Sequence, residues 1–231
     1  LALERQGVKV GRAKIKLGAV PDDAVFLIAH QSAPLSVLVR SINKLSNNFM
    51  AEQILKTLDA RPGPATFAGA LGRVRAWVES VGVPTEGLVL GNGSGLYDNN
   101  RITAAQLTAL LSAVYRDERI RPDYMASLAI MGVDGTTRSR LRSSSRAGWV
   151  RVKTGTLDGV SALSGYAGAP DRKPIVFSIL LNGLRKSDAS QARALQNEIA
   201  ELLALHAAGQ PLVTLADAKK GEGGAIDEGE E

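Results

Sequence analysis

Two short segments of this 231-residue sequence combine side chains suited to acyl-transfer chemistry: Ser46-Asn47-Asn48 and Lys153-Thr154-Gly155. A serine hydroxyl can pass protons, and an asparagine amide can hold a substrate carbonyl while bonding a neighbouring lysine. In the second segment the lysine brings positive charge, the threonine hydroxyl suits a carboxylate, and the glycine lets another backbone approach closely. Taken singly, each segment is unspecific, because helix capping accounts for the first and a strand followed by a turn accounts for the second.

The order of the two segments and the residues around them are more specific. Ser-x-Asn before Lys-Thr-Gly belongs, with Ser-x-x-Lys, to the motif set of penicillin-binding proteins and class A β-lactamases. Within residues 43–182 the stretches NKLSNNFMAEQILKTL, GSGL followed by NR, GVDGT, and VKTGTLDGVSALSGYA add further matches. Together they resemble the sequence blocks of D-alanyl-D-alanine carboxypeptidases/endopeptidases of the insert-containing, low-molecular-mass penicillin-binding type. Asn47 stands where that family usually has Asp.

The resemblance implies a serine-type D-Ala-D-Ala carboxypeptidase/endopeptidase that acts on peptidoglycan stem peptides through an acyl-enzyme and binds β-lactam antibiotics. It also implies which residues of this chain take part in catalysis. Ser46 would relay a proton to the leaving amine, and Asn48 would hold a substrate amide. Lys153 would add positive potential and bond Ser46.

The same resemblance implies a substrate-binding set and a cellular place. The substrate-binding residues would be Thr154, for the terminal carboxylate, with Gly155 and Thr156, whose N–H would be one of two oxyanion donors. No metal or organic cofactor is implied. The protein would work in the periplasm or elsewhere in the cell envelope.

The implied fold is α/β (α+β): the penicillin-recognising serine hydrolase, or β-lactamase-like, fold. It has an antiparallel sheet flanked by helices plus a helical part, and we expect it to be incomplete at the N-terminus. Residues 1–210 would form the C-terminal portion of a transpeptidase-like catalytic domain. Residues 211–231 would be an acidic, Gly-rich tail, which we expect to be disordered because it has few apolar side chains.

The family's nucleophilic Ser-x-x-Lys motif has no convincing match. The string Ser41-Ile42-Asn43-Lys44 has the right spacing, but it directly precedes Ser46, and one loop can hardly supply opposite walls of a site. We therefore expect that the sequence begins within a longer protein and that this chain alone is inactive. We also expect it to require its own N-terminal half as a partner, since the missing elements would leave apolar surface exposed.

Periodicity and capping signals predict the elements that position these residues. Helices are expected over residues 34–44, 49–58 with Asn48 as N-cap, 66–81, 103–115 and 189–206, with a short helix near Pro122. Short extended pieces are expected at VKV and AVFLIA within residues 8–28, and residues 131–148 are expected to be irregular. Strands are expected over residues 149–154, 160–167 and 175–181, as an antiparallel meander with Lys153-Thr154-Gly155 on an edge strand that accepts substrate backbone.

Composition excludes several other classes of protein. There are no cysteines, and His30 and His206 lack metal-ligand spacing, so no metal site is expected. The sequence contains no run of 18 or more apolar residues, so no membrane-spanning helix is expected. The whole chain has a formal net charge of +5 and residues 217–231 carry −4, so the remaining residues carry +9. Only 4% of residues are aromatic, which disfavours a nucleic-acid partner.

Three rival interpretations remain at this level. A non-catalytic cell-wall-binding or interaction module could reuse the same fold, and a Ser-x-x-Lys upstream would decide against it. A β-lactamase is disfavoured by the GSGL and DGT blocks. A basic nucleic-acid-binding domain rests on charge alone, with no binding motif.

Overall fold

The computed structural model describes residues 2–7, 9, 17–26, 28–60, 64–97, 99–169 and 171–210. The chain divides into two compact units, residues 1–32 and 33–231. The first unit contains the short helix α1 (Ala2–Arg5), and its described residues 17–26 and 28–32 form no strand, so the extended piece expected near Val25 is not a β-strand. The acidic tail and most of the VKV piece lie outside the described residues. No described helix is both long and apolar enough to cross a membrane.

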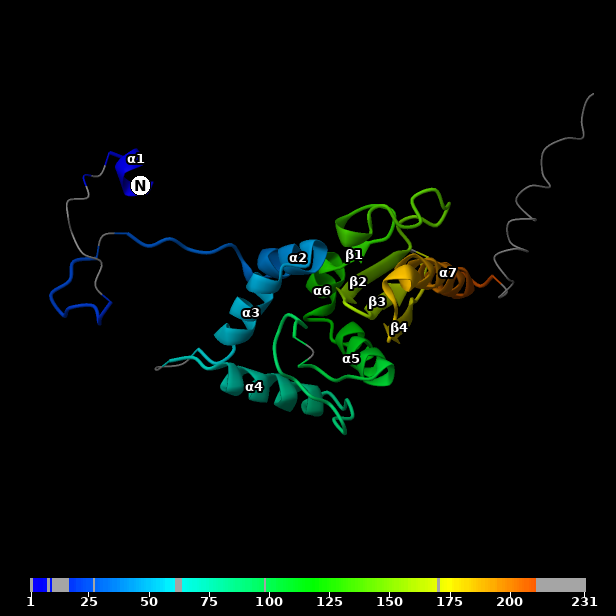
Figure 1. Cartoon of the computed structure of the whole chain (residues 1–231), viewed down its shortest axis with the longest axis horizontal. Helices are drawn as coiled ribbons and strands as arrows, with labels where there is room; N and C mark the ends of the chain where they lie inside the picture. The colour runs from blue at the N-terminus through cyan, green and yellow to red at the C-terminus, as the bar shows by residue number, and fades with distance from the viewer. Residues whose placement is uncertain are drawn as a thin grey trace, which may run out of the picture. The chain divides into compact units, whose positions relative to one another are not determined.

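A four-stranded antiparallel sheet, ordered β1-β2-β3-β4, is the centre of the second unit (Figure 1). Its strands are β1 (Ala129–Ile130), β2 (Val150–Leu157), β3 (Val160–Ala167) and β4 (Ile175–Asn182). The turn Asp158-Gly159 joins β2 to β3 and sets a register in which Lys153 lies opposite Ser164. The expected meander is therefore confirmed, with β2 three residues longer than predicted at its C-terminal end.

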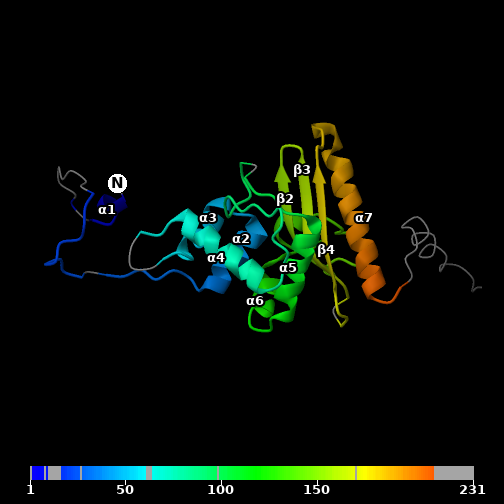
Figure 2. The ribbon, with the colours of Figure 1, turned by 90° about the horizontal axis from the view of Figure 1, so that it is seen from below.

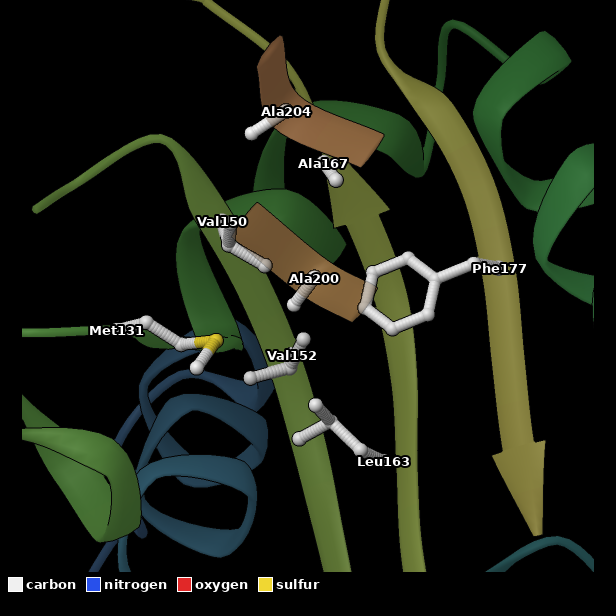
Figure 3. Packing of buried hydrophobic residues seen from close by; sticks show 8 residues of the cluster. All are labelled: Met131, Val150, Val152, Leu163, Ala167, Phe177, Ala200 and Ala204. Carbon is white, nitrogen blue, oxygen red and sulfur yellow. The ribbon is translucent and has the colours of Figure 1, made fainter. Parts of the chain in front are cut away.

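One face of the sheet packs against the long helix α7 (Ala189–Ala207). Side chains of β2, β3 and β4 that share this face meet small alanines of the helix, which let the helix approach the strands closely (Figure 3). The buried cluster consists of Met131, Val150, Val152, Leu163, Ala167, Phe177, Ala200 and Ala204. Alternate positions along β2 face away from this core, and Lys153 is one of them.

The opposite face is covered by α5 (Ala104–Arg116), so the sheet lies between two helical layers (Figure 2). Tyr166 of β3 is buried here, and its hydroxyl donates a 2.8 Å hydrogen bond to the Leu111 carbonyl oxygen of α5. Thr103 and Gln106 form a capping box that starts α5 where the sequence predicted it.

The helical part contains α2 (Leu35–Leu45), α3 (Asn48–Thr57), α4 (Phe67–Ser80) and α6 (Arg121–Ser127). These bounds confirm the predicted helices to within two residues at most ends, and Pro122 lies in the first turn of α6 as expected. Residues 131–148 contain turns and the short 3₁₀ helix η1 (Gly135–Thr137), in agreement with the irregular segment that was predicted. A second 3₁₀ helix, η2 (Lys186–Asp188), leads into α7.

Two local predictions were wrong. Asn47, not Asn48, caps α3, because the Asn47 side chain accepts from the Met50 N–H at 3.0 Å. The strand that carries Lys153 is also not the outermost strand, because the two-residue β1 pairs with Arg151 and Val152. From Lys153 onward, no described strand pairs with the outer side of β2, so the free edge begins at the motif itself.

Candidate active site

A cavity of about 490 Å³ lies where the α2–α3 junction, the loop 92–96 and β2 meet. All six residues that the sequence assigned to the site line it: Ser46, Asn48, Lys153, Thr154, Gly155 and Thr156. The helical part supplies one wall and the sheet supplies the other. The sequence could place each segment on its own element, and the fold brings the two together across more than a hundred positions.

The two walls are joined by a direct side-chain contact. Lys153 Nζ donates a 2.8 Å hydrogen bond to Ser46 Oγ and a 2.7 Å hydrogen bond to the carbonyl oxygen of Thr154. The expected bond between Lys153 and Ser46 is therefore present in the structure. Burial lowers the pKa of Lys153 below 10.5, since the charged form loses hydration. No carboxylate among the described residues forms an ion pair with Lys153, so its charge is directed to hydroxyl and carbonyl groups.

Ser46 is held in an unusual backbone conformation. It ends α2 with φ 55° and ψ 51°, in the left-handed region that non-glycine residues seldom occupy. The N–H of Asn47 bonds back to the Ile42 carbonyl oxygen at 3.2 Å, and Asn47 then starts α3. Such a conformation costs on the order of 1 kcal/mol and persists where its surroundings enforce it. The two helices therefore fix the position from which the serine hydroxyl meets Lys153.

Asn48 is free to act in the cavity because its neighbour caps the helix. Its side chain is exposed and makes no hydrogen bond with the described part of the chain. An amide in this position offers both a donor and an acceptor to a ligand.

On the sheet wall, Thr154 is half-buried, and its hydroxyl lies 2.9 Å from the hydroxyl of Thr136. Thr136 is part of the GVDGT stretch, for which the sequence suggested no individual role. Gly155 faces Ala162 of β3, and a Cβ at this glycine would lie 3.3 Å from the Ala162 Cβ. Among the described residues no group of His, Cys, Asp and Glu side chains is suited to hold a metal ion.

The match to a family model covers nearly the whole chain. Residues 1–205 match the model described as the D-Ala-D-Ala carboxypeptidase 3 (S13) family. The chain belongs to this family. The resemblance to D-alanyl-D-alanine carboxypeptidases, inferred from the Ser-x-Asn and Lys-Thr-Gly segments, is thereby confirmed.

The chain is also similar to individual proteins of this type. The chain is 38% identical over 218 residues to the D-alanyl-D-alanine carboxypeptidase of Actinomadura sp. (strain R39), covering 90% of this chain and 39% of that protein. The structure is similar to penicillin binding protein 4 (dacB) of Haemophilus influenzae in complex with a β-lactam, with a TM-score of 0.74 and 25% identity. That similarity covers 87% of this chain and 49% of the other. The chain thus spans less than half the length of either protein.

A TLA-1 β-lactamase shares the fold, with a TM-score of 0.53 and 16% identity, over 72% of this chain and 62% of that one. At this identity the similarity concerns the fold alone. The expected β-lactamase-like α+β fold is confirmed, and the S13 match separates this chain from the β-lactamases themselves.

The structure also reveals a contact between the segment that contains Ser46 and the GVDGT stretch that contains Asp134. Lys44, just before Ser46, donates hydrogen bonds to the Leu128 carbonyl oxygen at 2.9 Å and to the Asp134 carboxylate, which is 90 positions away. Burial by itself raises the pKa of Asp134. Hydrogen bonds from Lys44 and from the Ile130 N–H together lower the pKa by more than burial raises it, so the net pKa lies below 3.8. The end of α2 is thereby tied to the segment that leads into the sheet.

This contact bears on the Ser41-Ile42-Asn43-Lys44 string. Lys44 donates hydrogen bonds to Asp134 and Leu128, and neither Ser41 nor Lys44 lines the cavity. The geometry agrees with the sequence-based decision that this string is not the nucleophile motif.

A second contact between the S13 blocks was missed by sequence reasoning. Glu52 of α3 accepts hydrogen bonds from the backbone N–H groups of Ser94 at 2.9 Å and Gly93 at 3.2 Å. A Cβ at Gly93 would lie 3.1 Å from the Ala51 carbonyl oxygen, so the loop sits tightly against α3. The AE and GSGL blocks contained the signal, because a carboxylate and a glycine-rich run of N–H groups are natural partners.

Proposed function

We propose that this chain provides the Ser-x-Asn and Lys-Thr-Gly walls of a serine-type D-Ala-D-Ala carboxypeptidase/endopeptidase that acts on peptidoglycan stem peptides. The 2.8 Å hydrogen bond between Lys153 and Ser46, inside a cavity that is open to ligand, is the observation that carries the proposal. Membership in the S13 family supports it.

The proposed reaction proceeds by acyl transfer. A serine hydroxyl attacks the carbonyl of the penultimate D-Ala, an ester bond forms, and the C–N bond to the terminal D-Ala breaks. The lysine of the Ser-x-x-Lys motif takes the proton of the attacking serine as general base and passes it to Ser46, which delivers its own proton to the leaving amine. Lys153 donates to Ser46 and stabilises the developing negative charge. Water then hydrolyses the ester, which releases the shortened peptide and returns the proton to the serine. A β-lactam enters the same first step by opening of its ring.

The substrate is proposed to bind along the free side of β2. The backbone of an extended peptide adds to this edge beyond Lys153, and the Thr156 N–H donates to the oxyanion. The Thr154 hydroxyl binds the terminal carboxylate, and Gly155 leaves room for the peptide chain. Asn48 completes the site by bonding a substrate amide.

The nucleophile is proposed to come from outside these 231 residues, on a segment that is also the structural partner of this chain. The only Ser-x-x-Lys string in the sequence is the one whose lysine is bound to Asp134. Helix α2 buries none of its residues, and Leu45 and Phe49, on either side of the Ser46 motif, are 73% and 72% exposed. An apolar surface of this kind suits a covering segment from the N-terminal half of the same domain. The periplasm or cell envelope is the compartment that this substrate implies.

Labelling with a fluorescent penicillin tests the proposal. The 231-residue chain is compared with a form that also carries the coding region upstream of Leu1. The longer form should label at a Ser-x-x-Lys serine and release D-Ala from a stem pentapeptide, and Ser46→Ala and Lys153→Ala should each slow acylation by roughly 10²-fold or more. The shorter form should not label. A longer form that binds stem peptide without labelling would instead support a non-catalytic wall-binding module.

A further inference from the structure

Thr136 contacts Thr154, the residue proposed to bind the substrate carboxylate. Its Oγ1 lies 2.9 Å from Thr154 Oγ1, although the two residues are 18 positions apart and belong to different elements. Thr154 lines the cavity, whereas Thr136 does not. Thr136 is exposed, and it contacts a cavity-lining side chain through this hydrogen bond with Thr154.

The loop that presents Thr136 is firmly held. Asp134 accepts a 2.8 Å hydrogen bond from the Ile130 N–H and binds Lys44 at the end of α2. Gly135 has a φ of 60°, and a Cβ there would lie 2.8 Å from the Ala129 Cβ and 3.0 Å from the Lys44 carbonyl oxygen. Only glycine fits this left-handed, crowded position without a shift. The position of Thr136 is thus fixed by the same contacts that fix the Ser46 motif.

The direction of the hydrogen bond between the two hydroxyls has a chemical consequence. Each threonine hydroxyl has one proton, so in the pair one oxygen donates and the other accepts. A carboxylate can only accept hydrogen bonds. When Thr154 donates its proton to a bound carboxylate, the bond between the two threonines is retained only if Thr136 donates to Thr154.

We propose that Thr136 is a positioning residue: it donates to Thr154 and so turns the Thr154 hydroxyl toward the free carboxylate of a stem peptide. This inference rests on the proposed function. It assigns to Thr136 part of the preference for peptides that end in a free D-Ala carboxylate, the carboxypeptidase substrates, over peptides in which that carboxylate is blocked. Thr136 forms no bond with the reacting atoms.

The test uses the complete enzyme, in which this chain is joined to its Ser-x-x-Lys portion, and two peptides. One ends in D-Ala-D-Ala with a free carboxylate, and the other is the corresponding C-terminal amide. Thr136→Val should raise KM for the free carboxylate roughly five- to tenfold, leave kcat within about twofold, and leave the amide unaffected. Thr136→Ser keeps the hydroxyl and should restore the wild-type preference. Val133→Ala, at an exposed position of the same loop, should leave KM and kcat unchanged for both peptides.

The outcomes separate this inference from the function on which it rests. A wild-type enzyme that does not distinguish the two peptides overturns the role of Thr154 and, with it, that of Thr136. A wild-type enzyme that does distinguish them, combined with a Thr136→Val variant that keeps the same ratio of kcat/KM values, overturns the role of Thr136 alone. An equal loss on both peptides, with no rescue by Thr136→Ser, also overturns it, since a general disturbance of the loop then accounts for the result.

Discussion

Lys153 Nζ donates a 2.8 Å hydrogen bond to Ser46 Oγ, although 107 positions separate the two residues in the sequence. One end of the bond belongs to a strand whose alternate side chains form the core against α7, and the other to a left-handed residue between two helices. The bond exists because the sheet and the helical part are each locked by their own contacts. Its strength therefore depends on residues well outside the two motifs.

The lowered pKa of Lys153 can be observed directly by NMR. We expect the ¹³Cε resonance of Lys153 to titrate with a midpoint below 10.5, because burial disfavours the charged ammonium. Since the folded pKa is below the unfolded one, the folded state gains stability as pH rises from the lowered value toward 10.5 and has lost that gain at lower pH. The resonance is assigned by its absence in Lys153→Arg, and the same resonance in urea is the reference. A midpoint equal to the urea value would contradict the expectation.

Local patterns predicted the parts of the fold that depend on neighbouring residues. The alternation along 160–167, with the Asp158-Gly159 turn before it, was enough to predict β3 and its pairing with β2. Thr103 identified the start of α5 because a capping box is a local signal. The motif segments predicted the site residues because the resemblance marked them.

The sequence did not predict contacts between distant segments or choices between equivalent neighbours. Strand β1 has only two residues, too few for any periodicity. Asn47 and Asn48 are adjacent and equally able to cap a helix, so type alone could not choose between them. The bonds of Lys44 to Asp134 and of Glu52 to the loop at Gly93 join segments 90 and 41 positions apart, and no local pattern specifies such pairs.

The ion pair between Lys44 and Asp134 should contribute measurably to stability. Asp134→Asn should lower the free energy of unfolding in urea by about 1 kcal/mol at pH 7, a modest value because the Asp134 side chain is 35% exposed. The folded pKa of Asp134 lies below 3.8, so the contribution is present above that pH and is lost as pH falls through the folded pKa. The difference between wild type and variant should thus shrink in acid.

An exposed ion pair provides the control for that experiment. Arg75 and Glu79 form an i,i+4 pair with side chains 44% and 51% exposed, and Glu79→Gln should cost no more than about 0.5 kcal/mol. Equal effects of Asp134→Asn and Glu79→Gln would show that the Lys44 contact has no special structural weight.

The N-cap of α3 can be assigned by comparing the two neighbouring asparagines. Asn47→Ala should destabilise the protein by about 1 kcal/mol, because the Met50 N–H loses its acceptor. Asn47→Asp should be neutral or slightly stabilising, since a carboxylate also caps and favours a helix N-terminus. Asn48→Ala should change stability by less than about 0.5 kcal/mol, measured by urea unfolding. The opposite order of the two alanine variants would mean that Asn48 is the cap.

Glu52 should hold in place the part of the cavity wall that Gly93 and Ser94 form. Its carboxylate accepts from the N–H groups of Gly93 and Ser94, and both residues line the cavity. Glu52→Ala removes both acceptors, so we expect amide hydrogen exchange at Gly93 and Ser94 to become faster by roughly tenfold, the loss of about 1.4 kcal/mol of local stabilisation. Glu52→Gln keeps one acceptor oxygen, so its exchange rates at Gly93 and Ser94 should lie between those of wild type and those of Glu52→Ala.

The same loop contains an internal reference for this measurement. The Gly95 N–H is bound to Asn92 Oδ1 at 2.7 Å and does not contact Glu52, so its exchange should change much less. If the loop is displaced, acylation of the complete enzyme by penicillin should also slow, because Gly93 and Ser94 line the same cavity as Lys153. Exchange that quickens equally at Gly93, Ser94 and Gly95 would indicate opening of the whole loop, and unchanged exchange at Gly93 and Ser94 would show that Glu52 does not hold them.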